Sequence, residues 1–286
     1  MTKSLTYGVG VNFRSEIADE LLLHSNRFDF IEVITDLLFI SDRLPEVLEH
    51  LLIEKPCVLH GLKMSLGAAE PLNQEYLNKT IAAVQKWNPL WFSDHLAYTR
   101  VGNFDIDQLM PVRRNKENLK ELISKIKKIC KKTETPFLIE NITYYFEFPN
   151  THYLEAEFLS ALTSETNCGL LLDLNNLYIN ACNHQFDAYD FLNKIDLSRV
   201  VEIHIAGGVI RNEMLIDSHG HSISKDVWEL LKYVCDRVVP KGIVIERDAN
   251  FDIDDILNSL DMAKQILYSS KSYKNKIKNN FALDNI

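Results

Sequence analysis

The chain has 286 residues, of which 46% are hydrophobic and 25% are charged, and its formal net charge is −9. These proportions are typical of a globular protein that buries a full core. The acidic balance gives no electrostatic attraction to nucleic acid or to an anionic membrane surface, so we expect neither as a partner.

Eight apolar runs alternate with helical patterns along the chain. The predicted strands are Leu5–Phe13, Phe28–Ile34, Cys57–Leu62, Trp91–Thr99, Pro136–Thr143, Gly169–Leu174, Val200–Ala206 and Gly242–Asp248. The predicted helices lie near Glu16–Leu23, Pro45–Ile53, Glu75–Trp87, Lys116–Lys132, Leu154–Thr163, Ala188–Lys194, Lys225–Val238 and Asp254–Leu267. Near-continuous apolar strands are expected where both faces are buried, as in a parallel sheet. The alternation therefore predicts an α/β fold, a closed (β/α)8 TIM barrel.

We find no domain boundary inside this pattern. Residues 1–268 are predicted to form a single catalytic TIM-barrel domain, followed by a basic C-terminal tail over residues 269–286 that we expect to be loosely docked. The longer insertions follow strands, on the face where a barrel carries its active site. They are Gly61–Gln74, Arg100–Asn115, Tyr144–Tyr153 and Gly207–Ser224.

Cysteine usage and the N-terminal sequence indicate the compartment. Five cysteines are scattered without a CxxC pair, which suits a reducing cytoplasm and provides neither a disulfide framework nor a zinc-thiolate site. Met1–Ser4 lead directly into the first strand without the apolar region of a signal peptide. Because there is also no apolar run of the ~20 residues needed to span a bilayer, the sequence predicts a cytoplasmic protein.

Six of the predicted strands carry a metal-binding side chain at the point where the apolar run stops. These residues are His60, His95, Glu140, Asp173, His204 and Glu246. Asp217 and His219 lie in a loop as Asp-x-His, and Asn176 follows Asp173 by three residues. Since the carboxyl ends of barrel strands surround one mouth, we expect all nine side chains to converge there. Imidazoles and carboxylates without thiolates favour iron, manganese, zinc or cobalt.

Each of these residues alone has a simpler explanation. A lone histidine in an apolar strand is more often a hydrogen-bonded core residue, and a lone glutamate can pair with a basic residue. The set is harder to explain, because buried carboxylates cost free energy unless they are paired or bind a metal. Lys63 and Arg247 are nearby but cannot balance four carboxylates. The sequence therefore predicts a metal centre.

Six short motifs surround the proposed ligands. They are His60-Gly61-Leu62, Ser93-Asp94-His95-Leu96, Leu138-Ile139-Glu140-Asn141, Leu172-Asp173-Leu174-Asn175-Asn176, Ile203-His204-Ile205-Ala206-Gly207 and Asp217-Ser218-His219-Gly220. Together they resemble the multinuclear non-heme iron-dependent oxidative enzymes, which include the oxidases of methanobactin biosynthesis. The resemblance extends from Tyr7 to Asp248. More distantly, the ligand order resembles endonuclease IV and the xylose isomerase-like barrels.

The resemblance implies a ligand set and a reaction. One metal would be held by His60, His95 and Glu140, with Glu140 bridging to a second metal on Asp173, His204 and Glu246, and Asn176, Asp217 and His219 would hold a third. The cofactors would be two or three iron ions in mixed ferrous and ferric states, with molecular oxygen as co-substrate. The substrate would be a ribosomally synthesised precursor peptide, modified at cysteine, with a small partner protein presenting its leader. His219 and Asp248 would be the catalytic residues and transfer protons.

Two other classes of function remain open at this point. One is a metal-dependent sugar isomerase or apurinic endonuclease on the same barrel. We find no catalytic lysine or histidine for an isomerase, and Gly102–Gln108 is acidic where an endonuclease needs basic loops. The other is a non-catalytic barrel that binds a peptide or a partner. Such a scaffold has no physical need for buried, uncompensated acids.

Overall fold

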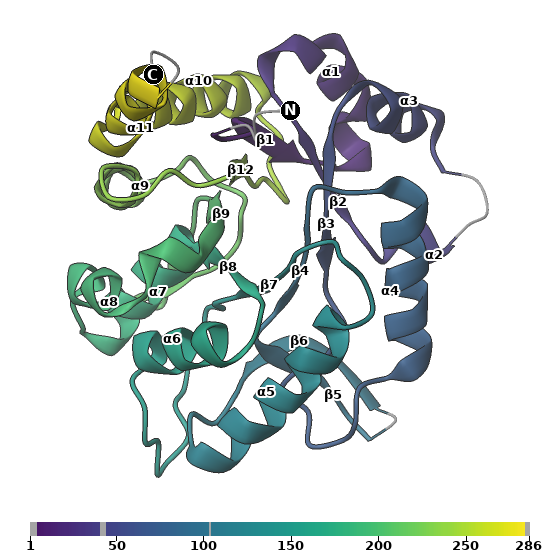
Figure 1. The fold of residues 1–286 in the computed structure, drawn as a ribbon, viewed down its shortest axis with the longest axis vertical. Helices are drawn as coiled ribbons and strands as arrows, with labels where there is room; N and C mark the ends of the chain where they lie inside the picture. The colour runs from purple at the N-terminus through teal and green to yellow at the C-terminus, as the bar shows by residue number, and fades with distance from the viewer. Residues whose placement is uncertain (1–4, 41–43, 103, 284–286) are drawn as a thin grey trace.

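The computed structural model describes residues 5–40, 44–102 and 104–283, and its centre is a closed barrel of eight parallel strands (Figure 1). The barrel strands are β1 (Val9–Asn12), β2 (Ile31–Ile34), β3 (Cys57–Gly61), β4 (Phe92–His95), β7 (Phe137–Glu140), β8 (Gly169–Asp173), β9 (Val200–Ile205) and β12 (Gly242–Ile245). The barrel closes where β1 pairs with both β12 and β2. Each barrel strand lies within one of the eight predicted runs, so the predicted fold is confirmed.

Helices surround the barrel in chain order, as Figure 1 shows. They are α1 (Ala18–Leu23), α2 (Leu37–Ile40), α3 (Glu46–Glu54), α4 (Gln74–Trp87), α5 (Lys116–Cys130), α6 (Glu155–Glu165), α7 (Leu174–His184), α8 (Ala188–Lys194), α9 (Lys225–Cys235) and α10 (Ile253–Ser269). Alternate strand residues face outward and pack against apolar helix stripes. On α5 the buried stripe contains Leu122, Ile126 and Ile129, as the helical period predicts.

The lower interior of the barrel is a separate apolar cluster. It consists of Phe30, Val58, Trp91, Leu138, Leu171 and Val244. The ring of Phe30 fits because Gly10 and Gly242 have no side chains, and a Cβ at either position would lie 2.7 Å from that ring. Gly10 therefore serves close packing in the first strand.

Two hairpins and the start of helix α7 are among the features that were not predicted. The predicted strand Trp91–Thr99 is divided, because β4 ends at His95 and the chain then forms a hairpin of β5 (Ala97–Val101) and β6 (Phe104–Pro111). A second hairpin of β10 (Val209–Arg211) and β11 (Met214–Ile216) occupies the loop after β9. Helix α7 begins directly after β8, in a stretch where no helix was predicted. Both hairpins lie at the barrel mouth because they follow the carboxyl ends of strands.

The C-terminal tail forms a further helix, α11 (Lys271–Leu283), which lies beside α10 in Figure 1. Lys271 N donates to Asp236 Oδ1 (2.9 Å), and the Ser272 hydroxyl donates to the Cys235 carbonyl (2.5 Å). These bonds fix the start of α11 to the end of α9. Residues 284–286 of the predicted tail and Met1–Ser4 lie outside the described residues. Within the described part of the chain, no helix combines the length and apolarity needed to cross a membrane.

Candidate metal centre

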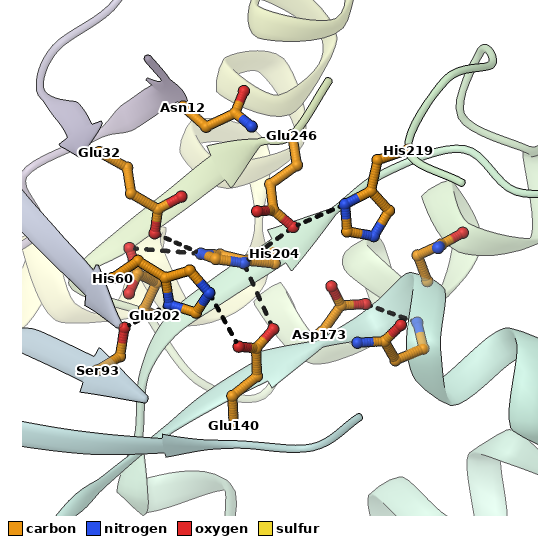
Figure 2. A network of polar contacts seen from close by, with 12 residues as sticks. Asn12, Glu32, His60, Ser93, Glu140, Asp173, Glu202, His204, His219 and Glu246 are labelled. Carbon is orange, nitrogen blue, oxygen red and sulfur yellow. Dashed lines mark hydrogen bonds and ion pairs between the residues drawn. The ribbon is translucent and has the colours of Figure 1, made fainter. Parts of the chain in front are cut away.

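The six strand-end residues predicted as ligands meet in the upper interior of the barrel, and Figure 2 shows all of them except His95. Their side chains come from the ends of β3, β4, β7, β8 and β9 and from the residue after β12. None of the six is more than 7% exposed. The strand register brings them level, since His60 pairs with Ser93, His95 with Glu140, and Asp173 with His204.

Glu140 lies between two sets of ligands. Its Oε2 lies 3.4 Å from His60 Nε2 and 3.2 Å from His95 Nε2. Its Oε1 faces the other way, 3.6 Å from His204 Nδ1. Glu140 consequently belongs to two groups of three residues. It lies with His60 and His95 in the first group and with Asp173 and His204 in the second. Within each group the ligand atoms lie within 4.8 Å of one another. One carboxylate with an oxygen toward each group is suited to bridging two metal ions.

A third group lies beside the second. Glu246 Oε2 is 3.1 Å from His204 Nδ1 and 3.5 Å from His219 Nδ1, and Asp173 joins His219 and Glu246 within the same 4.8 Å limit. His219 Nε2 lies 2.7 Å from Asp217 Oδ1. His219 therefore lies close to both Asp217 and Glu246.

Asn176 lies at the start of α7, on the edge of the same cavity. Its backbone N–H donates to Asp173 Oδ1 (2.6 Å), so Asp173 caps the helix and α7 starts without a loop. The Asn176 side chain accepts from the Thr143 hydroxyl (2.6 Å) and donates to the Asn141 carbonyl (3.1 Å). These bonds hold the amide in place beside the centre.

The two predicted catalytic residues lie next to each other at the cavity wall. His219 Nδ1 is 3.4 Å from Asp248 Oδ2. The other carboxylate oxygen of Asp248 accepts from Asn12 Nδ2 (3.0 Å) and pairs with Arg14 (2.5 Å). Arg14 was not singled out from the sequence. One oxygen of Asp248 is thus fixed by two donors, while the other faces His219.

Two buried acids near the centre were missed by the sequence analysis. Glu32 Oε2 lies 2.9 Å from His204 Nε2, and Glu202 Oε1 lies 3.9 Å from the same nitrogen (Figure 2). Glu202 Oε2 accepts a hydrogen bond from Trp91 Nε1 (2.8 Å). Both acids are 0% exposed. Glu202 had a usable signal, because it precedes His204 by two residues and strand side chains repeat with period two.

Burial dominates the ionisation of the acids. Loss of solvation raises the pKa of Glu140 well above its usual range, that of Asp173 to about 7 and that of Glu202 to about 8. Protons therefore neutralise part of the acidic charge when no cation is bound.

The histidines divide into two kinds. Burial lowers the pKa of His60 well below its usual range and that of His95 to about 4, so both rings are neutral at pH 7. Burial acts the same way on His204 and His219, but adjacent acids outweigh it and raise the pKa of both. Their positive charge in turn lowers the pKa of Glu246 well below its usual range, against the effect of burial. Protons thus occupy the ring nitrogens that face acids, where a metal would displace them.

The donor set fits metal ions. Polar atoms that make no normal hydrogen bond within the described residues include Glu140 Oε2, Asp173 Oδ2 and His204 Nδ1. The ion pairs formed by Glu140 and Glu246 within the same residues run only to histidines. Buried carboxylates without a compensating cation are costly, and a divalent or trivalent ion would satisfy them.

The centre opens into a cavity of about 430 Å³ at the mouth. Arg14 and Lys63 are the lysine and arginine side chains that line it. Lys63 reaches across to the β5–β6 hairpin, with Nζ 2.8 Å from Asp105 and 3.0 Å from Asp107. Because these cations are already paired at the rim, they do not neutralise the buried acids.

The sequence and the fold both match known proteins. A family model described as RiPP precursor modification enzyme MbnB/TglH/ChrH matches residues 8–268. A Caulobacter vibrioides protein named "UPF0276 protein" is 35% identical over 238 residues, which are 82% of this chain and 85% of the relative.

Solved structures resemble the barrel at low sequence identity. D-psicose 3-epimerase from Clostridium cellulolyticum has a TM-score of 0.60 at 10% identity and covers 93% of this chain and 99% of its own. Endonuclease IV from Thermus thermophilus has a TM-score of 0.56 at 17% identity and covers 92% and 99%. At these identities the likeness shows the fold alone, which is that of the xylose isomerase-like barrels.

Proposed function

The chain belongs to the RiPP precursor modification enzyme family MbnB/TglH/ChrH, and from this premise we propose that it oxidises a ribosomally synthesised precursor peptide, at cysteine, with iron and molecular oxygen. The observation that carries the proposal is the position of Glu140, whose two oxygens face two different groups of buried ligands. That arrangement supports a centre of more than one metal ion.

The proposed ligands are assigned as follows. His60, His95 and Glu140 would hold one ion, and Glu140 would be shared with a second ion held by Asp173, His204 and Glu246. Asn176, Asp217 and His219 hold a third when it is present, and the short distances from His219 to Glu246 and Asp217 support its place beside the second ion. The proposed cofactors are two or three iron ions of mixed ferrous and ferric state, which would supply one-electron chemistry with oxygen.

Asp248 and His219 are proposed to move protons during the reaction. Asp248 lies at the cavity wall, 38% exposed at its side chain, so it is accessible to a substrate. Asn12 and Arg14 fix its Oδ1, which leaves Oδ2 for the substrate or for His219. A carboxylate held in this way is suited to general base catalysis.

The rim of the mouth supports a peptide substrate and a small leader-binding partner protein. Apolar side chains are exposed on segments that follow barrel strands, including Phe104 on β6 (73%) and Ile210 on β10 (71%). Tyr145 and Phe146, in the loop after β7, are each 43% exposed. Exposed apolar groups around a cavity are typical of surfaces that bind another chain.

The metal is tested on protein purified without oxygen. We expect elemental analysis and Mössbauer spectroscopy to find two or three iron ions per chain. Full occupancy by zinc, together with no activity after reconstitution with iron, would contradict the proposal.

The substrate is tested by co-expression with each short cysteine-containing peptide encoded beside the gene, followed by mass spectrometry of the peptide. We expect an oxygen-dependent mass change that is lost when the cysteine is changed to serine. Asp248→Asn should keep its iron and lose activity by a factor of about 100 or more. Equal conversion of the serine peptide would exclude cysteine as the target.

A further inference from the structure

The histidines of the centre differ in what binds the ring nitrogen that faces away from the proposed metals. Nδ1 of His60 lies 2.8 Å from the Ser93 hydroxyl, and Nδ1 of His95 lies 3.1 Å from a backbone carbonyl. Both of these partners are neutral. Nε2 of His204 instead lies 2.9 Å from a carboxylate oxygen of Glu32. The two sides of Glu140 therefore differ in the groups behind them, which are neutral behind His60 and His95 and a carboxyl group behind His204.

The surroundings of Glu32 strengthen this difference. Glu32 and His204 are both 0% exposed, and charges in such low-dielectric surroundings interact strongly. The ion pair that Glu32 forms within the described residues is with His204. Glu202, also 0% exposed, lies on the same side of the ring, 3.9 Å from Nε2. Behind His204 there are thus acids, and behind His60 a hydroxyl.

We propose that Glu32 is a positioning residue which, through His204, makes the ion on His204 Nδ1 the one most readily held as ferric iron. The inference rests on the proposed iron-dependent function and assigns its two oxidation states to two sides of one centre. A carboxylate that accepts the Nε2–H bond fixes the tautomer and makes Nδ1 a stronger electron donor. That donation and the nearby negative charge stabilise an Fe³⁺ ion more than an Fe²⁺ ion. The ion on His60 and His95 lacks a charged partner of this kind.

A merely structural role for Glu32 predicts something different. If Glu32 only orients the ring, Glu32→Gln removes the charge, keeps the shape and an accepting oxygen, and leaves the preference between Fe²⁺ and Fe³⁺ unchanged. Ser93→Ala is the matched control, because it removes the corresponding neutral partner of His60.

The experiment is a redox titration of the iron-loaded, full-length protein, followed by EPR and Mössbauer spectroscopy, for the unaltered chain and both variants. We expect Glu32→Gln to lower the Fe³⁺/Fe²⁺ ratio of the more easily oxidised ion at least tenfold at a given potential, equivalent to a rise of about 59 mV for one electron. Ser93→Ala should change it by less. A Glu32→Gln shift no larger than that of Ser93→Ala overturns the inference.

Iron content is measured first on each protein, so that the causes of failure are separated. If the unaltered protein binds no iron, the proposed function and the inference fall together. If Glu32→Gln loses an ion, its affinities for Fe²⁺ and Fe³⁺ are compared separately. Weakening that is at least tenfold greater for Fe³⁺ supports the inference, and equal weakening overturns it.

Discussion

Two layers of the barrel interior are built from the same strands and have opposite properties. Leu138 lies in the apolar lower layer, and Glu140, two residues later on β7, lies in the metal centre. Val244 and Glu246 repeat this relation along β12. Strand side chains alternate between faces, so residues two apart both point into the barrel, one layer above the other. The lower layer stabilises the fold, whereas the upper layer costs stability until cations bind.

Among the proposed substitutions, Glu140→Gln should have the largest effect, because it disrupts metal binding in the upper layer. Removing the shared carboxylate is expected to weaken metal binding about 100-fold or more, since even outer partners of metal ligands contribute roughly 10- to 100-fold. Without metal, the same variant should unfold at a higher temperature than the unaltered protein at pH 7, because the amide, unlike the buried carboxyl group with its raised pKa, takes up no proton on folding. Elemental analysis and thermal unfolding measure the two effects.

Asn176→Ala is the control for Glu140→Gln. Its amide lies beside one group of ligands and is not shared between two, so it should reduce the iron content by at most one ion per chain. Equal metal loss in the two variants would contradict the bridging position of Glu140.

Leu138→Ala should break the lower layer and leave the upper one intact. Leu138 is 0% exposed, and truncation of a buried leucine costs about 2–5 kcal/mol. Urea unfolding should show this loss, while the iron content per folded chain stays unchanged. Loss of iron from the folded variant would show that the two layers are coupled.

The pH dependence of stability tests the upper layer without a substitution, because the lower layer consists of apolar side chains. Because the folded pKa values of Asp173 (about 7) and Glu202 (about 8) are raised, folding keeps protons that the unfolded chain releases. The contribution of these two groups to the stability of the metal-free protein should therefore fall as the pH rises from about 4, where unfolded carboxyl groups titrate, to about 8, with on the order of 4 kcal/mol of the fall above pH 6. Metal affinity should rise over the same range, since binding displaces these protons. Urea unfolding of chelator-treated protein measures the fall, and Glu202→Gln should reduce it.

His95 acts in the opposite direction to these acids between about pH 4 and pH 6.5. The folded pKa of His95, about 4, lies under that of a free histidine, so the unfolded chain binds a proton that the folded one excludes. The fall in stability expected from Asp173 and Glu202 should accordingly be shallower below about pH 6.5 than above it. A stability that rises steadily from pH 6 to pH 8.5 would contradict the assigned ionisation.

Lys63→Ala should have the smallest effect, because Lys63 lies above both layers. Its ion pairs with Asp105 and Asp107 are at least 42% exposed on both sides, and exposed pairs contribute about 0–1 kcal/mol. We expect unchanged iron content and a change in unfolding free energy below about 1 kcal/mol. Iron loss in this variant would show that the hairpin supports the centre.

The sequence predicted the strand-end ligands because they interrupt apolar runs. His60, Glu140 and Asp173 each stop such a run, and parallel strands leave one place for their side chains to meet. Glu32 was missed because it lies inside the run Phe28–Ile34, where apolar neighbours on both sides conceal its direction.

The sequence analysis also missed helix α7 and the β5–β6 hairpin, because local interactions decide where these elements begin. The helix after Asp173 was not predicted, because its start depends on the Asp173 side chain capping α7. The β5–β6 hairpin was merged with the preceding strand, since Ala97–Thr99 continue its apolar pattern. Only the pairing of Ala97 with Pro111 identifies a separate sheet. Periodicity detects a barrel strand, but not the point at which its partner changes.

The fit of the Phe30 ring against Gly10 and Gly242 bears on where molecules can enter the barrel. With that ring in place, the described barrel interior is filled by apolar side chains at its lower end and is open at the mouth. Under the proposed function, ions, oxygen and peptide would all enter through the same opening. A bound peptide would then block that opening, so the order in which the reactants bind would affect the reaction.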